Sequence, residues 1–219
     1  MGKKRLKTVQ SDSSYLVGKI VLLALIVLVV VGVGFGAYVL INQAGSGGSN
    51  SGGGSSQYRI SSVPTNKILL VTSMGNITIE LYADMPITSE NFKNLTKLGI
   101  YDGTIFHRVV KGFVVQGGDP TGTGMGDPSI ARIPDELPNK HSNVRGSVAM
   151  AKTSEPNSAT SQFYINLVDN SANLDSNYSV FGRVTKGMDV VDKIANVAVD
   201  ENDRPLSNVT LIRALFLEE

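Results

Sequence analysis

The chain has 219 residues, 42% of them hydrophobic, which is enough for one globular domain with a sizeable core and a smaller additional segment. It contains no cysteine, and this excludes disulfides, thiolate catalysis and metal sites built on sulfur. Beyond residue 19 the chain carries 15 basic and 18 acidic residues, and this mildly acidic balance argues against nucleic acid as a partner.

The first predicted element is an uninterrupted apolar run at residues 20–41, IVLLALIVLVVVGVGFGAYVLI. As a helix it would be about 33 Å long, which is enough to cross a bilayer. Two other interpretations fit less well: a cleavable signal peptide has a shorter apolar region and a small-residue cleavage site, and a buried core helix seldom lacks a polar face. We therefore interpret the run as an uncleaved transmembrane signal anchor that contacts the lipid bilayer.

The charges on either side of this run predict its orientation. Segment 1–19 is basic, with five Lys and Arg residues, whereas the next positive charge beyond the run is Arg59. Because positive charge favours the cytoplasmic side, we expect a single-pass protein of the cell membrane with a cytoplasmic N-terminus and an extracytoplasmic body. Residues 42–63 have the Gly/Ser-rich composition of a flexible linker, and residues 64–219 are predicted to form the folded domain.

The folded domain begins with segments that have the composition of β-strands. KILLVT and NITIELY flank the turn-like SMGN and predict a hairpin. Six further segments predict strands: TIFHRVV, FVVQ, SVAMA, SQFYINL, SVFGRV and VTLIRALFLE. Between the fourth and fifth of these eight strands, residues 117–143 contain repeated Gly and Pro and are predicted to form a long structured loop, a type of segment that is commonly functional.

Two segments have helical patterns. PITSENFKNLTKLG, at residues 86–99, has Pro86 near its start, a stop at Gly99, and an apolar face formed by Phe92, Leu95 and Leu98. GMDVVDKIAN, at residues 187–196, predicts a short helix that presents Val190, Val191 and Ile194. Many strands with two helices predict a mainly β fold, either a closed barrel or a sandwich.

Several short motifs suggest chemistry but do not fit it. GTGMGD has the spacing G-x-G-x-G, and two prolines follow where a phosphate-binding helix would begin. The two histidines, His107 and His141, cannot form a metal site unaided, and NSATSQF lacks the G-x-S-x-G elbow of an acyl-enzyme hydrolase. We therefore expect no cofactor and no metal.

The segment FHRVVKGFVVQGGD places Arg108 and Gln116 among apolar residues. On a strand, Phe106 and Arg108 would point to one side and His107 to the other. Lys111-Gly112 predicts a bulge that changes the facing, so that Val114 and Gln116 need not share the face of Arg108. An arginine on a half-exposed strand is most often solvated, so this pattern alone leaves both a surface role and a pocket role open.

Three blocks of the sequence, in this order, resemble the signature blocks of the cyclophilin family of peptidyl-prolyl isomerases: FHRVVKGFVVQGGD, VAMAKTSEPNSATSQFYIN and LDSNYSVFGRVTKGMDVVDKI. The resemblance runs from about residue 66 to the C-terminus and leaves the apolar run and the linker outside it. It implies a closed eight-stranded antiparallel β-barrel capped by two α-helices, preceded in this chain by the transmembrane helix.

The resemblance also implies the residues of an active site. Arg108 corresponds to the family's catalytic arginine. The implied substrate-binding residues are Phe113, Val114, Gln116, Ala151, Lys152, Gln162, Tyr164, Leu174 and Tyr178. Four positions depart from the common pattern of the family: Lys152 replaces an asparagine, Tyr164 a phenylalanine, Tyr178 a histidine, and Asn173 an aromatic residue. Because of the change at Asn173, we expect weak cyclosporin binding.

Rotation about an X-Pro bond has a barrier of about 20 kcal/mol and neither makes nor breaks a bond between heavy atoms. The reaction therefore needs no nucleophile, metal or acid-base pair, and an arginine beside an apolar pocket suits it. We expect a peptidyl-prolyl cis-trans isomerase whose monomeric catalytic domain acts on proline-containing unfolded or secreted polypeptides outside the cytoplasm. Two alternatives stay open: a non-catalytic, membrane-tethered peptide-binding chaperone that uses the same groove, and a structural role in which the anchor recruits the domain to a membrane complex.

Overall fold

Strands β1 (Lys67–Thr72) and β2 (Gly75–Leu81) form the predicted antiparallel hairpin, in which Ile68 lies opposite Ile79 and Leu70 opposite Ile77. All four of these side chains are fully buried in the main core. They belong to a computed structural model that describes residues 58–218. The predicted basic segment, the apolar run at 20–41 and most of the predicted linker lie outside the described residues. Within residues 58–218, no helix combines the length and the apolar character needed to cross a bilayer.

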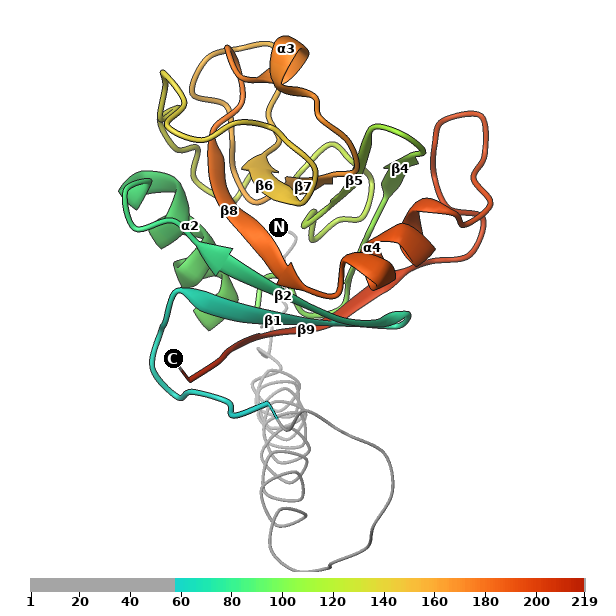
Figure 1. Ribbon diagram of the computed structural model, residues 1–219, viewed down its shortest axis with the longest axis horizontal. Helices are drawn as coiled ribbons and strands as arrows, with labels where there is room; N and C mark the ends of the chain where they lie inside the picture. The colour runs from blue at the N-terminus through green and yellow to red at the C-terminus, as the bar shows by residue number, and fades with distance from the viewer. Residues whose placement is uncertain (1–57, 219) are drawn as a thin grey trace, which may run out of the picture. The chain divides into compact units, whose positions relative to one another are not determined.

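The described strands join in a single curled antiparallel sheet (Figure 1). Its order is β3-β9-β1-β2-β8-β6-β7-β5-β4. Beyond the first hairpin, the strands are β3 (Thr104–Ile105), β4 (Arg108–Val110), β5 (Val114–Gly117), β6 (Ser147–Met150), β7 (Phe163–Asn166), β8 (Val180–Lys186) and β9 (Thr210–Phe216). The prediction of a mainly β, antiparallel fold is confirmed.

The prediction of a closed eight-stranded barrel is wrong in two respects. The predicted strand TIFHRVV is divided into β3, which pairs with β9, and β4, which pairs with β5, so that the sheet has nine strands. Strands β3 and β4 are the two edges of the sheet and do not pair with each other, so the barrel is not closed. The division has a physical reason: Phe106 and His107 are only 1% and 6% exposed, and two successive buried side chains break the alternation of a strand.

Three helices accompany the sheet in the described residues: α2 (Pro86–Lys97), α3 (Ser171–Leu174) and α4 (Met188–Ala195). Both predicted helices are confirmed, and α4 buries Val190, Val191 and Ile194 as expected. Leu98 was wrongly assigned to the apolar face of α2, because it follows the helix as its C-cap residue and is 72% exposed. The single turn of α3 was not predicted.

Helices α2 and α4 lie on different sides of the curled sheet (Figure 1). Helix α2 packs against β8 and β9, and α4 packs against β2, β4 and β5. Phe92 of α2 places its ring centroid 5.3 Å from that of Phe163 and 5.2 Å from that of Phe181. This inner core fixes the strands whose outer faces carry the candidate site.

Candidate active site

A row of directly opposed residues crosses five neighbouring strands, β4, β5, β7, β6 and β8. Its members are Arg108, Gln116, Tyr164, Ala149 and Val180, each the cross-strand partner of the next. Directly opposed residues in an antiparallel sheet point to the same face. The row therefore brings an arginine, an amide and an apolar patch together on the outer face of the sheet.

The inner face of the same strands carries the main core. Val109, Val115, Ile165 and Val148 form the parallel row that faces inward, and each is at most 2% exposed. Successive residues of each strand point to opposite faces of the sheet, so every residue of the outer row is flanked along its strand by a residue that is packed in the core. The backbone of the outer row is anchored by the core on the other side of every strand.

Residues 111–113 form a turn that joins β4 to β5, and Gly112 adopts a φ of 74° there. The predicted bulge is therefore wrong, since the chain simply reverses as a hairpin. Such a positive φ suits glycine, which has no Cβ to clash with the backbone. Val114 and Gln116 consequently share the face of Arg108, a point that the sequence left open.

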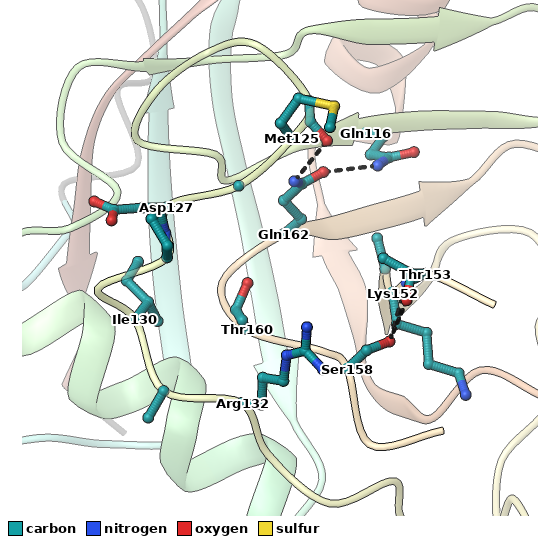
Figure 2. A pocket seen from close by; sticks show the side chains of 15 residues that line it. Gln116, Met125, Asp127, Ile130, Arg132, Lys152, Thr153, Ser158, Thr160 and Gln162 are labelled. Atoms are coloured by element: carbon teal, nitrogen blue, oxygen red, sulfur yellow. Dashed lines mark hydrogen bonds between the residues drawn. The ribbon is translucent and has the colours of Figure 1, made fainter. Parts of the chain in front are cut away.

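Arg108 begins a chain of side-chain hydrogen bonds. Its Nη1 donates to Oε1 of Gln116 over 3.4 Å, and Nε2 of Gln116 donates to Oε1 of Gln162 over 3.0 Å. Nε2 of Gln162 in turn donates to the carbonyl oxygen of Gly124 over 3.0 Å. Figure 2 shows Gln162 between Gln116 and the loop that carries Met125. The Arg108 side chain as a whole is 39% exposed, so it is held by Gln116 on one side and remains accessible to solvent.

The loop that receives this chain is organised by Asp119. Its Oδ1 accepts the N–H of Thr121 over 2.9 Å, and its Oδ2 accepts the N–H groups of Gly124 and Gly126 over 2.7 and 3.1 Å. Burial acts to raise the pKa of Asp119, but the hydrogen bonds from Thr121, Gly126 and Gly124 outweigh it and hold that pKa below its usual value. Two backbone donors of the glycine-rich GTGMGD segment, those of Gly124 and Gly126, are thus occupied by a carboxylate of the same chain. This agrees with the rejection of a phosphate-binding role.

His107 lies beneath the same loop, and it is 6% exposed. Burial lowers its pKa, Arg204 and Arg108 act in the same direction, and Asp119 and Gln162 oppose them. Nδ1 of His107 has no hydrogen-bond partner among the described residues. His107 is therefore a neutral, buried neighbour of the site at neutral pH.

The apolar half of the row extends into a cluster that we call the socket. Val114, Ala149, Tyr164 and Val180 form its buried floor. Partly buried residues surround this floor: Tyr82, Phe113, Ala151, Leu174 and Tyr178. The structure thus brings together six of the predicted substrate-binding residues, namely Phe113, Val114, Ala151, Tyr164, Leu174 and Tyr178.

The hydroxyl of Tyr164, which we expected to need a partner, donates to Oδ1 of Asn143 over 2.8 Å. Burial raises the pKa of Tyr164 far above its usual value, so the hydroxyl stays protonated and acts as a donor. The ring of Tyr178 meets the ring of Tyr164 edge-on, with centroids 6.0 Å apart. Asn173, on α3, is exposed.

A cavity of about 490 Å³ adjoins the amide chain, and Gln116, Ala151, Lys152 and Gln162 are among its lining residues. Asp127 and Ile130 lie on one side of it, and Lys152 and Ser158 lie on the other (Figure 2). Nζ of Lys152 is 2.7 Å from Oδ2 of Asp135, and both side chains are nearly buried. The charge introduced by Lys152 is thus neutralised by a partner within the domain.

Several residues of the site were not predicted from the sequence. Asn143, Asp135 and Asp203 reach it through tertiary contacts from segments without a regular pattern. Asp119 had a local signal, because an Asp before a glycine-rich segment commonly accepts hydrogen bonds from the backbone that follows. Among residues 58–218, no three His, Asp or Glu side chains cluster as a metal ion would require.

Comparisons with known proteins match the part of the chain that carries this site. Residues 67–215 match the family described as cyclophilin type peptidyl-prolyl cis-trans isomerase. A peptidyl-prolyl cis-trans isomerase of Acinetobacter baylyi is 50% identical over 131 residues, which cover 58% of this chain and 70% of the relative. One from Arabidopsis thaliana is 39% identical over 155 residues, which cover 69% of this chain and 94% of the relative.

A solved structure has the same fold. The cyclophilin type peptidyl-prolyl cis-trans isomerase of Cryptosporidium parvum, crystallised in the presence of the dipeptide Ala-Pro, matches with a TM-score of 0.66 and 32% identity. The match covers 70% of this chain and 99% of that protein. The segment before residue 67 lies outside the family match.

Proposed function

The chain belongs to the cyclophilin family of peptidyl-prolyl cis-trans isomerases, and from this premise we propose that Arg108 is its catalytic residue and that the socket binds the proline ring. The isomerase activity follows from the family and its named relatives, whereas the roles of individual residues are our proposal. The observation that carries it is the row of opposed residues from Arg108 to Val180, which sets a guanidinium group beside an apolar floor.

The proposed role of Arg108 follows from the change that the amide undergoes. As the X-Pro bond twists, conjugation is lost and the proline nitrogen regains its lone pair. A permanently charged donor can then hydrogen-bond to that nitrogen or to the proline carbonyl more strongly than it does in either planar state. An interaction that strengthens only in the twisted state lowers the barrier rather than merely tightening binding.

The proposed role of the socket is to hold the ring while the carbonyl on its N-terminal side rotates. Val114 and Tyr164, 2% and 4% exposed, offer a preformed apolar floor, and Phe113 and Leu174 stand beside it. A proline ring in this position would exclude water and thereby strengthen each polar contact made by Arg108. Gln116, which bridges Arg108 and Gln162, would hold the guanidinium at the edge of the socket.

The proposed substrates are proline-containing polypeptides, in particular unfolded or secreted chains. The dipeptide Ala-Pro present with the Cryptosporidium relative supports this substrate class. The cavity beside Gln116 and Gln162 offers space for a residue next to the proline. Because every residue of the row comes from one chain, we propose that the catalytic domain acts as a monomer.

A paired assay tests the role of Arg108. Isomerisation of an Ala-Pro peptide is followed by a protease-coupled assay with the fragment from Gln57 onward, as wild type and as Arg108→Ala. We expect kcat/KM to fall by about 10²–10³ in the variant, the range seen when a donor to a developing charge is removed. The matched control is Arg213→Ala, since Arg213 also lies on a strand, on β9, and is 3.7 Å from Asp102 in a similar ion pair. Equal rates for wild type and Arg108→Ala would end the assignment.

We also propose that the enzyme is anchored to the cell membrane through residues 20–41 and works outside the cytoplasm. The apolar run and the excess of basic residues before it support this placement. Intact cells treated with an impermeant protease should lose the catalytic domain from the membrane fraction. A domain that stays protected until the cells are lysed would contradict the orientation.

A further inference from the structure

The loop at residues 200–204 lies next to β4, the edge strand that carries Arg108. The N–H of Val109 donates to the carbonyl oxygen of Asp203 over 2.8 Å, so the loop is joined to β4 at the neighbouring residue. Oδ2 of Asp203 lies 3.8 Å from Nε of Arg108, within ion-pair distance. We infer that Asp203 is a positioning residue, which orients the guanidinium of Arg108 for the isomerase reaction. The inference rests on the proposed catalytic role of Arg108.

The loop presents this carboxylate from a fixed backbone. Oδ1 of Asp200 accepts the N–H groups of Asn202 and Arg204 over 2.8 and 3.0 Å. The N–H of Asp203 donates to the carbonyl oxygen of Asp200 over 3.1 Å, and the N–H of Asp200 donates to that of Arg204 over 2.8 Å. Asp203 itself has a φ of 62°, in the left-handed region that Asp and Asn tolerate better than most residues. The backbone that carries this carboxylate is therefore held by the turn, independently of the arginine.

The next residue of the loop links Asp203 to the other side of the site. Nη1 of Arg204 donates to the carbonyl oxygen of Gly122 over 2.7 Å, in the loop that Asp119 organises. The carbonyl oxygen of Gly124 in the same loop accepts the hydrogen bond from Gln162. Together with the short chain segments 122–124 and 203–204, these contacts form a closed ring that begins and ends at Arg108. It runs through Gln116, Gln162, Gly124, Gly122, Arg204 and Asp203.

This ring fixes the guanidinium from two sides. Gln116 accepts from Nη1, and the carboxylate of Asp203 lies on the Nε side. Within residues 58–218, the structure gives Nη2 no hydrogen-bond partner, and the side chain is 39% exposed, so these donors are free to bind a substrate. An arginine that is already oriented loses less rotamer entropy when it meets the twisted amide. Loss of the Asp203 contact should therefore lower kcat more than it changes KM.

The test uses the full chain in detergent and compares Asp203→Asn with Glu201→Gln. Asparagine keeps the shape of Asp203 and tolerates its backbone conformation but removes the charge. Glu201 is an exposed acid of the same loop, so Glu201→Gln removes an equal charge without touching Arg108. We expect Asp203→Asn to lower kcat by about threefold to fivefold with KM nearly unchanged, because exposed ion pairs have effects of this size. Glu201→Gln should keep the wild-type rate.

A second variant, Asp203→Gly, removes the whole side chain and suits the positive φ, so it should lose at least as much kcat as Asp203→Asn. A double-mutant cycle separates positioning from a structural effect. In an Arg108→Ala background, Asp203→Asn should have no further effect on kcat/KM, because there is no guanidinium left to orient. The difference in kcat between wild type and Asp203→Asn should also become smaller at high salt, because salt screens exposed charges.

Three results would overturn the inference. Wild-type kcat in both Asp203→Asn and Asp203→Gly would show that the carboxylate does nothing. An increase in kcat would show that it competes with the substrate for Arg108. An equal loss in the wild-type and Arg108→Ala backgrounds would show that it acts on the fold alone. If Arg108→Ala itself retains full activity, the proposed role of Arg108 fails instead, and the two failures are thereby distinguished.

Discussion

The two ends of the row across the outer face of the sheet are held by different forces. At one end, Arg108 and Gln116 are connected by side-chain hydrogen bonds, through Gln162, to the loop that contains Gly124. At the other end, Tyr164, Ala149 and Val180 pack into a buried cluster on adjacent strands. The polar end therefore owes its geometry to loops, and the apolar end owes its geometry to the core. Substitutions at the two ends should accordingly change different quantities.

The largest effect is expected from Tyr164→Ala at the apolar end. Removal of this ring, which is 4% exposed, should lower the free energy of unfolding by about 3–5 kcal/mol and raise KM, because a cavity replaces the floor of the socket. Tyr164→Phe is the matched control, since it loses only the hydrogen bond to Asn143 and should cost about 1 kcal/mol. Urea denaturation and the isomerase assay measure both quantities. Equal losses of stability in the two variants would show that the ring does not support the socket.

A smaller effect of a different kind is expected at the polar end. Gln116→Ala removes the acceptor of Arg108 and the donor to Gln162, so the guanidinium loses one of its two supports. We expect kcat to fall about tenfold, the equivalent of one hydrogen bond to a charged group, with KM and stability nearly unchanged. Gln116→Glu, which keeps an acceptor for Arg108, should lose less. A rise in KM at constant kcat would place Gln116 in substrate binding instead.

The smallest effect concerns the pH dependence of stability at His107. Because burial lowers the pKa of His107 in the folded state, the unfolded chain takes up a proton first as the pH falls below about 6.5. The stability contributed by the neutral ring is thus complete above that pH and is lost as the pH falls toward the folded pKa, by at most about 1.4 kcal/mol per pH unit. Denaturant unfolding at pH 7.5 and 5.5 measures the free energy of unfolding, which should decrease less between these two pH values in His107→Gln than in wild type. Identical declines would contradict the effect of burial.

The elements with a clear period could be predicted from the sequence. The β1–β2 hairpin and the α4 face with Val190, Val191 and Ile194 were recognised because burial on one side imposes alternation or a helical spacing. Helix α3 has only four residues, too few for any period. The division of TIFHRVV could not be predicted, because it depends on which strands the two halves pair with, β9 and β5.

The candidate site also contains residues that could be predicted from the sequence and residues that could not. The residues of the socket lie on strands or near their ends, except Leu174 on α3, and the family resemblance assigned most of them. Asp203 and Arg204 join the site from a loop more than 90 residues beyond Arg108 in the sequence, through contacts that exist only in the folded chain. Asn143 likewise became identifiable only when the hydroxyl of Tyr164 was seen to donate to it. A polar support of this kind leaves no periodic signal in the sequence.

The central claim is that Arg108 acts on the twisted amide while the socket binds the proline. The most direct test measures binding and turnover of one Ala-Pro peptide by exchange NMR, with the fragment from Gln57 onward as wild type and as Arg108→Ala. We predict that Kd changes by less than about threefold while the exchange rate on the enzyme falls by about 10²–10³ in the variant. A Kd that weakens by the same factor as the rate would contradict it, because the arginine would then contribute to binding alone.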